Sequence, residues 1–357
     1  MSGKGFIRRS ALAAARTRGF ELFVAALERM MPARPGGFAV LTYHRVADPA
    51  LSPLCYPGLF TDPAEFAAQM TFLASRYRPL SLAELLGARR GEHALPLRSV
   101  LVTFDDGYRD FADHAWPILR RQGIPPVLFV PTAYPGDPGR AFWWDRLYSA
   151  VSRASAAGID TPVGELRLES TSDRVDAYRL LRSTVKSLPH EEGMKLVDEV
   201  CETLGAPPAR SEVLGWPELR RLGSEGVDLA PHSRSHPLLD KVPVETARAE
   251  IVGSLEDLER EVGRAARVFA YPAGGESPEV ARILVEERFE LAFSAKRGTN
   301  DIRTADWLRL RRINVGRASA VPLVRAQLLP RWHRPNSRRE VHEHQTRLDG
   351  HTALRNR

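Results

Sequence analysis

The stretch SVLVTFDDGYRD, residues 99–110, joins an apolar run directly to two adjacent carboxylates and a glycine. The run over residues 99–104 predicts a buried strand, because a short apolar, β-branched segment that ends at turn residues is typical of strands. Two like charges at one strand end raise each other's pKa unless a positive group lies between them or one of them acts as a base. Asp105 and Asp106 therefore indicate a nearby cation, although an Asp-Gly turn without further function is the alternative.

Strand-like and helix-like segments alternate on both sides of this stretch. One helix has a clear start signal, with Asp62 as N-cap, Pro63 at the first helical position and Glu65 two residues later. A repeated order of strand then helix argues for a parallel sheet, and six or seven such units predict an α/β fold, a closed or incomplete β/α barrel. Strands are predicted at 38–44, 99–104, 126–131, 227–230, 267–271 and 290–295, and helices at 62–77, 81–86, 111–123, 216–223, 244–262 and 277–289.

The domain organisation follows from breaks in this alternation. Residues 139–215 are mostly polar and helical in pattern with no clear strand, which predicts a helical insertion in the barrel. We assign residues 1–37 to a basic amphipathic N-terminal segment, 38–330 to the barrel with its insertion, and 331–357 to a disordered basic tail.

The net charge of +7 is concentrated at the two ends of the chain. Residues 1–34 carry seven Lys and Arg against two Glu, and residues 331–357 carry seven Arg against three acidic residues. The ends thus contribute +5 and +4, which leaves the body between them at about −2. A body that binds nucleic acid is therefore not indicated.

The N-terminal segment is too polar for a secretion signal or a membrane span. Arg16, Arg18 and Glu21 interrupt its apolar stretch, and no run in the chain reaches the length that crosses a bilayer. We therefore expect a cytoplasmic protein. The amphipathic stretch at 19–31 predicts a helix packed on the barrel, with peripheral contact at the anionic inner face of a membrane as the alternative.

The two cysteines, Cys55 and Cys201, lie far apart without CxxC spacing. Neither a disulfide framework nor a thiolate zinc site is predicted. A reducing compartment is compatible with this usage.

A second strand ends in two histidines. The stretch VDLAPHSRSHPLL, residues 227–239, places His232 and His236 four residues apart, a spacing that allows both imidazoles to face one point if the segment between them coils through one turn. A lone histidine is usually a satisfied polar residue, but two neutral imidazoles and one carboxylate form the ligand set of a catalytic divalent metal. We predict that Asp106, His232 and His236 hold this metal, while Asp105 acts as the base that deprotonates a bound water.

A third strand ends in RVFAYPAGG, residues 267–275. The Pro-Ala-Gly-Gly run brings backbone close to the same strand ends, where the N–H of Ala273 could stabilise a tetrahedral oxyanion. A glycine-rich turn without such a role is the alternative.

Together, TFDDGY, HSRSH and FAYPAGG, with LTYHRV at the first strand, resemble the polysaccharide deacetylase superfamily, also called the NodB-homology domain or carbohydrate esterase family four. The resemblance spans residues 38–315 apart from the insertion. It implies a distorted (β/α)7 barrel and metal-dependent N-deacetylation of N-acetyl sugars, with Asp105 as base and Asp106, His232 and His236 as metal ligands. The expected cofactor is a divalent metal, with zinc favoured over other divalent transition metals.

The chain departs from the better-known branch of this superfamily. That branch has an Arg-Pro-Pro-Tyr-Gly motif whose arginine tethers the base, whereas this chain has Ala270 and Ala273 at the arginine and tyrosine places, so the arginine's role is left unassigned. A late Leu-x-His is also unmatched. FAYP and YHRV resemble the exopolysaccharide branch, in which a histidine of the first strand enters the site. This would be His44, as the acid for the leaving amine or as a hydrogen-bonded strand-end residue.

Aromatic residues near the motifs are candidates for contact with a sugar ring. Trp143 and Trp144 of the insertion could form a platform, with core packing as the alternative. Tyr108 and Tyr271, which belong to the first and third motifs, are further candidates for substrate contact.

The predicted function is the hydrolysis of the acetamide of an N-acetylhexosamine unit, which releases acetate. The predicted partner is an N-acetylated glycan, such as a glycan precursor or a lipid-linked intermediate, and no obligate protein partner is evident. Two alternatives remain, a hydrolase of small cyclic amides that uses the same site and an inactive glycan-binding module.

Overall fold

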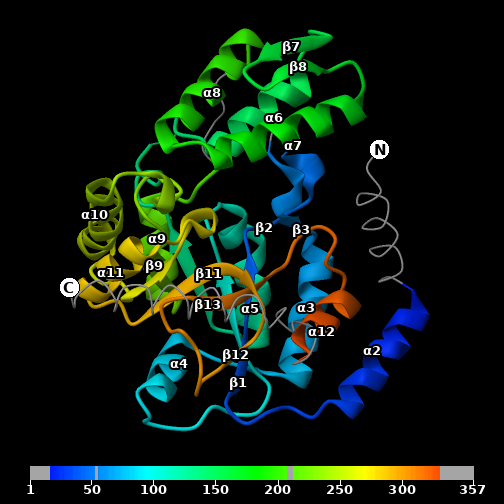
Figure 1. The fold of residues 1–357 in the computed structure, drawn as a ribbon. Coiled ribbons are helices and arrows are strands. Elements are labelled where there is room, and N and C mark those ends of the chain that lie inside the picture. Colours follow the sequence, from blue (N-terminus) through cyan, green and yellow to red (C-terminus); the bar gives the residue numbers. More distant parts are fainter. Residues whose placement is uncertain (1–16, 53–54, 138, 207–211, 330–357) are drawn as a thin grey trace, which may run out of the picture.

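Seven parallel strands form the centre of the molecule in the computed structural model, which describes residues 17–52, 55–137, 139–206 and 212–329 (Figure 1). The strands lie in the order β10-β11-β13-β1-β5-β6-β9, and each neighbouring pair is parallel. Their bounds are β10 Val268–Ala270, β11 Leu291–Arg297, β13 Leu310–Asn314, β1 Gly37–Tyr43, β5 Ser99–Phe104, β6 Pro126–Val130 and β9 Asp228–Pro231.

The two edges of this sheet approach each other, so the sheet nearly closes. The N–H of Ala266, just before β10, donates to the carbonyl of Leu229 in β9 at 3.2 Å. The short strands β4 (Arg78–Pro79) and β12 (Asn300–Asp301) pair with the starts of β5 and β1. This arrangement confirms the predicted distorted (β/α)7 barrel.

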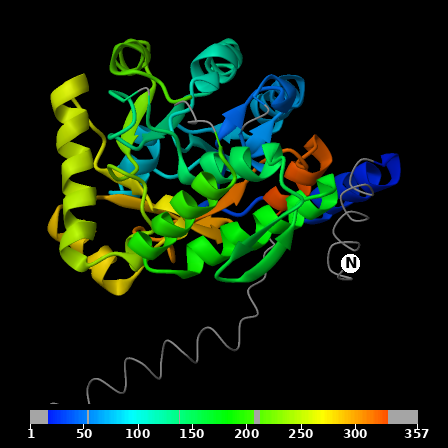
Figure 2. The same cartoon turned by 90° about the horizontal axis from the view of Figure 1, so that it is seen from above.

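Helices surround the sheet in Figures 1 and 2. The start signal at Asp62 acts as predicted, because its carboxylate accepts the N–H groups of Ala64 and Glu65. At the start of the next helix, Ser81 and Glu84 form a capping box. These helices are α3 Pro63–Arg76, α4 Leu82–Arg89, α5 Trp116–Gln122, α9 Trp216–Ser224, α10 Val244–Val262, α11 Pro278–Glu286 and α12 Val321–Leu328. Short segments complete the barrel: β2 Arg45–Val46, β3 Phe60–Thr61, η1 Pro49–Leu51, η2 Pro57–Leu59, the π-helical η3 Phe111–Ala115, η4 Leu239–Lys241 and η5 Pro272–Gly274.

Alternate residues of the central strands pack on opposite sides of the sheet. In β1, Phe38 and Val40 belong to the cluster inside the barrel, whereas Ala39 and Leu41 belong to the cluster under the surrounding helices. Both faces are covered, which explains why the strand sequences are continuously apolar.

The insertion forms a separate unit above the C-terminal ends of the strands (Figure 1). It has its own apolar cluster and contains α6 Trp143–Arg153, β7 Gly158–Thr161, β8 Gly164–Arg167, α7 Thr171–Ser187 and α8 His190–Thr203. The expectation of no strand here is wrong, because β7 and β8 form an antiparallel hairpin. Each strand buries a single apolar residue, Ile159 or Leu166, so the sequence lacks the alternation that predicts a strand.

Helix α2 (Arg18–Met30) packs against α12 on the outside of the barrel, where Val24 is buried and Arg325 pairs with Glu28 at 2.7 Å. Its outer face exposes Leu22, Phe23 and Met30 by 64%, 54% and 77%. Among the described helices, none combines the length and the apolar character that crossing a membrane requires. Residues 1–16 of the predicted N-terminal segment and the predicted tail at 331–357 lie outside the described residues.

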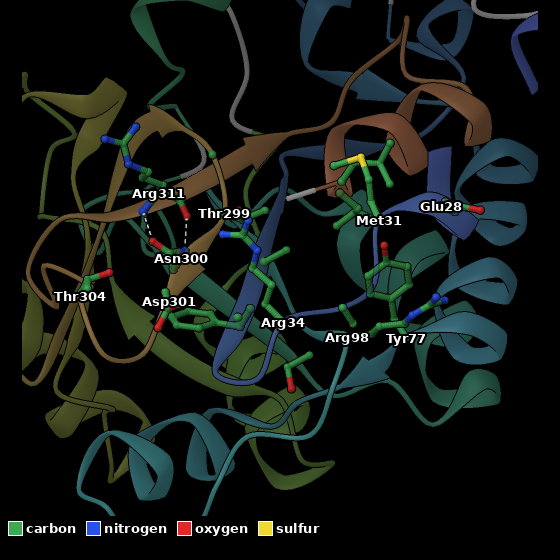
Figure 3. Close-up of a pocket in the computed structure, with 18 residues that line it drawn as sticks. Glu28, Met31, Arg34, Tyr77, Arg98, Thr299, Asn300, Asp301, Thr304 and Arg311 are labelled. Atoms are coloured by element: carbon green, nitrogen blue, oxygen red, sulfur yellow. Dashed lines mark hydrogen bonds between the residues drawn. The ribbon is translucent and has the colours of Figure 1, made fainter. Parts of the chain in front are cut away.

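A cavity of about 430 Å³ lies at the N-terminal ends of β1 and β5, where the end of α2 contributes to its wall (Figure 3). Arg34 and Arg98 are among its lining residues. Since chemistry in β/α barrels is built at the opposite, C-terminal ends of the strands, we do not assign the active site to this cavity.

Candidate active site

The C-terminal ends of the strands open into a second cavity of about 930 Å³. Its walls combine residues at the C-terminal ends of six strands, β1, β5, β9, β10, β11 and β13, with residues from the insertion. Among the predicted site residues, it is lined by His44, Asp105, Asp106, His232, His236, Ala273, Trp143 and Trp144. The three motifs, which lie between residues 103 and 275 of the sequence, therefore meet in one place, together with His44 of the first strand.

Asp106, His232 and His236 form a compact buried group. The Nε2 atoms of His236 and His232 lie 3.3 Å and 3.5 Å from Oδ1 of Asp106. One ligand atom from each residue lies within 4.8 Å of the others, so the group could hold a metal ion. Two imidazoles and a carboxylate thus converge as predicted.

The donor set fits a cation. Oδ1 of Asp106 is buried without a hydrogen-bond partner, although a buried carboxylate oxygen without compensation is costly. Nδ1 of His232 lies 2.7 Å from the carbonyl of Ala270, an interaction that leaves Nε2 directed at Asp106. Burial opposes ionisation of Asp106, but the two imidazoles hold the pKa of its carboxyl well below its usual value. A cation between these atoms would satisfy the carboxylate and both Nε2 atoms.

The backbone of the site is strained at the residues that form it. Asp106, Ser233, His236 and Ala273 have φ values of 73°, 62°, 61° and 49°, and they are four of the six described non-glycine residues with positive φ. Such conformations cost roughly 1–3 kcal/mol each and persist where the surroundings fix them. At one of them, Oγ of Ser233 accepts the N–H of His236 at 3.0 Å and so closes the turn between the two histidines.

Asp105 is held by an arginine that we had not identified from the sequence. Nη1 of Arg312 in β13 donates to Oδ1 of Asp105 at 2.8 Å, and Nε of the same guanidinium donates to the carbonyl of Ser294. Burial alone would raise the pKa of Asp105, but the guanidinium of Arg312 and the nearby imidazoles hold it below its usual value. This arginine has the position of the tether that the third motif lacks. The detectable signal is the spacing of apolar residues among arginines at Leu308, Leu310, Ile313 and Val315, which marks the seventh strand.

Removal of this guanidinium should change the pH dependence of any activity that uses Asp105. In Arg312→Gln the pKa of Asp105 rises, so the carboxylate becomes protonated at a higher pH and the acidic limb of the kcat/KM profile moves upward. We expect a loss of about tenfold or more at pH 6 and partial recovery in Arg312→Lys. An unchanged acidic limb, measured with full metal content, would contradict this role.

His44 lies beside the acid pair at the end of β1. Tyr43 pairs with Phe104 in the parallel ladder, and the N–H of Asp105 donates to the carbonyl of Tyr43 at 3.0 Å, so the next residue of each strand faces the cavity. Burial lowers the pKa of His44, while the charges of Asp106 and Asp105 oppose this effect. The imidazole is therefore neutral at pH 7 and must take up a proton before it can deliver one.

The turn after β10 lies at the cavity, where Ala273 is exposed. Ala273 lines the cavity, and Gly274 has a φ of +80°. A Cβ on Gly274 would lie 2.5 Å from Cβ of Ala295, so only glycine allows this turn to pack against β11.

Trp143 and Trp144 are mainly core residues whose edges reach the cavity. They are 6% and 7% exposed, and both line the cavity. The ring of Trp144 stacks on Phe142 at 4.4 Å and meets the ring of His236 edge-on at 4.8 Å. Trp144 thus packs against His236, and a sugar platform is limited to the exposed edges.

Tyr108 and Tyr271 do not have the positions that we predicted for substrate contact. Tyr108 is 1% exposed, and its hydroxyl donates to Asp145 at 2.9 Å while it accepts Nε1–H of Trp144. The hydroxyl of Tyr271 donates to the carbonyl of Leu308 at 2.9 Å. Tyr108 is buried in the apolar cluster of the insertion and Tyr271 in the cluster under α10 and α11, so we correct their role to packing and hydrogen bonding within the protein.

Comparisons with known proteins agree with this arrangement. The family described as "Polysaccharide deacetylase" matches residues 93–291, more than half of the chain. The Poly-beta-1,6-N-acetyl-D-glucosamine N-deacetylase of Escherichia coli (strain K12) is 33% identical over 92 residues, which are 26% of this chain and 13% of that protein. The chain thus aligns with only a small part of this curated relative.

Solved structures show the same fold at low sequence identity. The Streptococcus pyogenes deacetylase PplD, solved in complex with acetate, has a TM-score of 0.57 and 17% identity, with 83% of this chain and all of that chain covered. The structure of IcaB from Ammonifex degensii has a TM-score of 0.52 and 20% identity, with 82% of this chain and 97% of that chain covered.

Proposed function

Because the chain belongs to the polysaccharide deacetylase family, we propose that it hydrolyses the N-acetyl groups of N-acetylhexosamine units in a polysaccharide or glycan precursor and releases acetate. The convergence of Asp106, His232 and His236 beside the Asp105–Arg312 pair carries this proposal. The names of the Escherichia coli relative and of IcaB favour the exopolysaccharide branch of the family.

Asp106, His232 and His236 would hold a divalent metal, for which zinc is the favoured candidate. Zinc accepts imidazole nitrogen and carboxylate oxygen, and a catalytic site keeps a position open beside three protein ligands. When bound, such an ion supplies a Lewis acid that polarises an amide carbonyl and lowers the pKa of a water.

The other residues supply the remaining steps. Asp105, oriented by Arg312, accepts a proton as water attacks the acetamide carbon, and the N–H of Ala273 donates to the oxygen that becomes negative. His44 takes up a proton from solvent and passes it to the departing amine as the C–N bond breaks, and Asp105 returns its proton to solvent, so both residues regain their starting states. One water is consumed, and acetate and a free amine are formed.

The direct test is acetate release by the purified chain from β-1,6-linked and β-1,4-linked N-acetylglucosamine oligomers. We expect release that stops with a chelator and recovers with Zn²⁺ or another divalent metal. Faster turnover of cyclic amides would favour the alternative hydrolase. Glycan binding without turnover under any metal would favour an inactive binding module.

A His44→Ala variant tests the proposed general acid. Because this residue is not a metal ligand in our assignment, we expect turnover to fall by roughly 10²-fold while metal content stays at the wild-type level. A substrate with a better leaving amine should be less affected. Unchanged turnover would remove His44 from the mechanism and leave it as a strand-end residue.

We also propose that α2 places the enzyme at the cytoplasmic face of a membrane. Leu22, Phe23 and Met30 are exposed on one face, and residues 1–16 carry four Lys and Arg without an acidic residue. The full chain should bind vesicles that contain phosphatidylglycerol and lose this binding in Leu22→Ser/Phe23→Ser. No response to these vesicles, or a periplasmic location in cell fractionation, would contradict this placement.

A further inference from the structure

The insertion adds two cations to the active-site cavity. Arg182 and Lys186 lie one turn apart on α7, and both line the cavity that contains the Asp106 group. Arg317, which follows β13, lines it as well. Among the described lining residues, the acidic ones are Asp105 and Asp106. Asp105 is paired with Arg312, and Asp106 lies beside His232 and His236.

Arg182 and Lys186 have no carboxylate partner among the residues that the structure describes. Within the described ranges, neither side chain forms an ion pair or a hydrogen bond, and Arg182 lies over the ring of Tyr56 at 5.0 Å. The residues before 330 that lie outside the described ranges contain no acidic side chain that could serve as one.

The other two cationic side chains of α7 do have polar partners. Arg174 donates to the carbonyl groups of three residues, and Arg179 pairs with Asp176 at 3.2 Å on the exposed side. Only the two cations that face the cavity are left without partners among the described residues of α7.

The two neighbouring positive charges of Arg182 and Lys186 are electrostatically unfavourable when no anion is bound. Like charges one helical turn apart repel each other, and both side chains are half-buried. Burial and the charge of Arg182 lower the pKa of Lys186 to about 8, although the charge of Asp106 acts in the opposite direction. Unfavourable charge arrangements in a cavity are typical of sites whose ligand provides the missing charge.

We propose that the substrate carries an anionic group close to the reacting N-acetyl sugar, and that Arg182 and Lys186 bind this group. The inference rests on the proposed function, because the cations lie in the same cavity as the proposed deacetylation site. The shared chemistry is a negatively charged oxygen group, which can be the phosphate of an activated or lipid-linked sugar or the carboxylate of a uronic acid. Both groups suit a guanidinium with a neighbouring ammonium.

Binding to the metal-free full chain tests this inference without turnover and without direct coordination of the anion to a metal. Calorimetry compares N-acetylglucosamine 1-phosphate with the neutral methyl glycoside, and a disaccharide of N-acetylglucosamine and glucuronic acid with N,N′-diacetylchitobiose. We expect at least one anionic ligand to bind about tenfold or more tightly than its neutral counterpart, with a preference that weakens as salt increases. The pair with the larger preference identifies the source of the charge.

Variants of α7 test whether Arg182 and Lys186 cause the preference for anionic ligands. Arg182→Gln/Lys186→Gln should remove it, Arg182→Lys/Lys186→Arg should retain most of it, and the control Arg179→Gln, on the same helix but paired with Asp176, should leave it unchanged. Equal affinity for anionic and neutral ligands, or a preference that survives in the double glutamine variant, would overturn the inference.

Acetate release by the metal-loaded enzyme separates this inference from the proposed function. A binding preference without acetate release from any substrate would contradict the deacetylase activity but support the anion site. Equal kcat/KM for anionic and neutral substrates would support the activity and overturn the anion site.

Discussion

An Asp105→Asn variant is expected to lose acetate release by roughly 10²–10⁴-fold, which is the range that a general base contributes. The amide keeps nearly the size of the carboxylate, and its oxygen can still accept the hydrogen bond from Arg312. It cannot take a proton from the attacking water. The loss should therefore appear in kcat, with substrate affinity and metal content close to those of the wild type.

The control for this variant is Asp113→Asn, the same substitution at an exposed position eight residues later. Acetate release under saturating metal, together with metal analysis of each preparation, distinguishes a lost base from a lost metal. If Asp105→Asn kept more than a tenth of the wild-type kcat, Asp105 would not be the base.

Substitution of the proposed metal ligand Asp106 should reduce acetate release about as much as Asp105→Asn does, but through loss of the metal. Asp106→Asn tolerates the positive φ of this position but lacks the charge that binds a cation. We expect the affinity for Zn²⁺ to fall by about 100-fold or more and acetate release to fall to background. Without metal, the variant should be less stable than the wild type at pH 7, because the two imidazoles hold the pKa of Asp106 below its usual value and its ionised form therefore stabilises the folded state.

Thermal unfolding with and without Zn²⁺ measures both parts of this prediction. The wild type should gain stability with metal, by about 2.7 kcal/mol when free Zn²⁺ reaches 100 times the dissociation constant, and Asp106→Asn should gain much less at the same concentration. An equal gain in both proteins would show that Zn²⁺ stabilises the fold from another site.

The barrel and the proposed metal-binding group could be predicted because their signals are local. Asp105, Asp106 and His232 directly follow apolar runs, and strands of a parallel barrel end at the same face, so their convergence follows from position along each strand. The spacing of His232 and His236 allowed one turn between them, and the positive φ values of Ser233 and His236 show how the backbone makes that turn.

The features that we missed depend on contacts that local patterns do not contain. Arg312 reaches Asp105 across 207 residues of sequence, so its role becomes visible only once β13 is placed beside β1 and β11. Tyr108 directly follows the DDG motif, but its side chain turns inward because the hydroxyl group bonds to Asp145 of the insertion. Motif membership indicated that these positions matter, but it did not indicate which way the side chains point.

The most direct test of the account is an anomalous-scattering map from crystals of the full chain grown with Zn²⁺. The account predicts a peak at about 2.0–2.3 Å from an oxygen of Asp106 and from Nε2 of both His232 and His236, with Asp105 nearby but bonded to Arg312. A map with no peak between these three side chains, or with zinc bound only elsewhere, would contradict the claim that they form a metal-dependent catalytic centre.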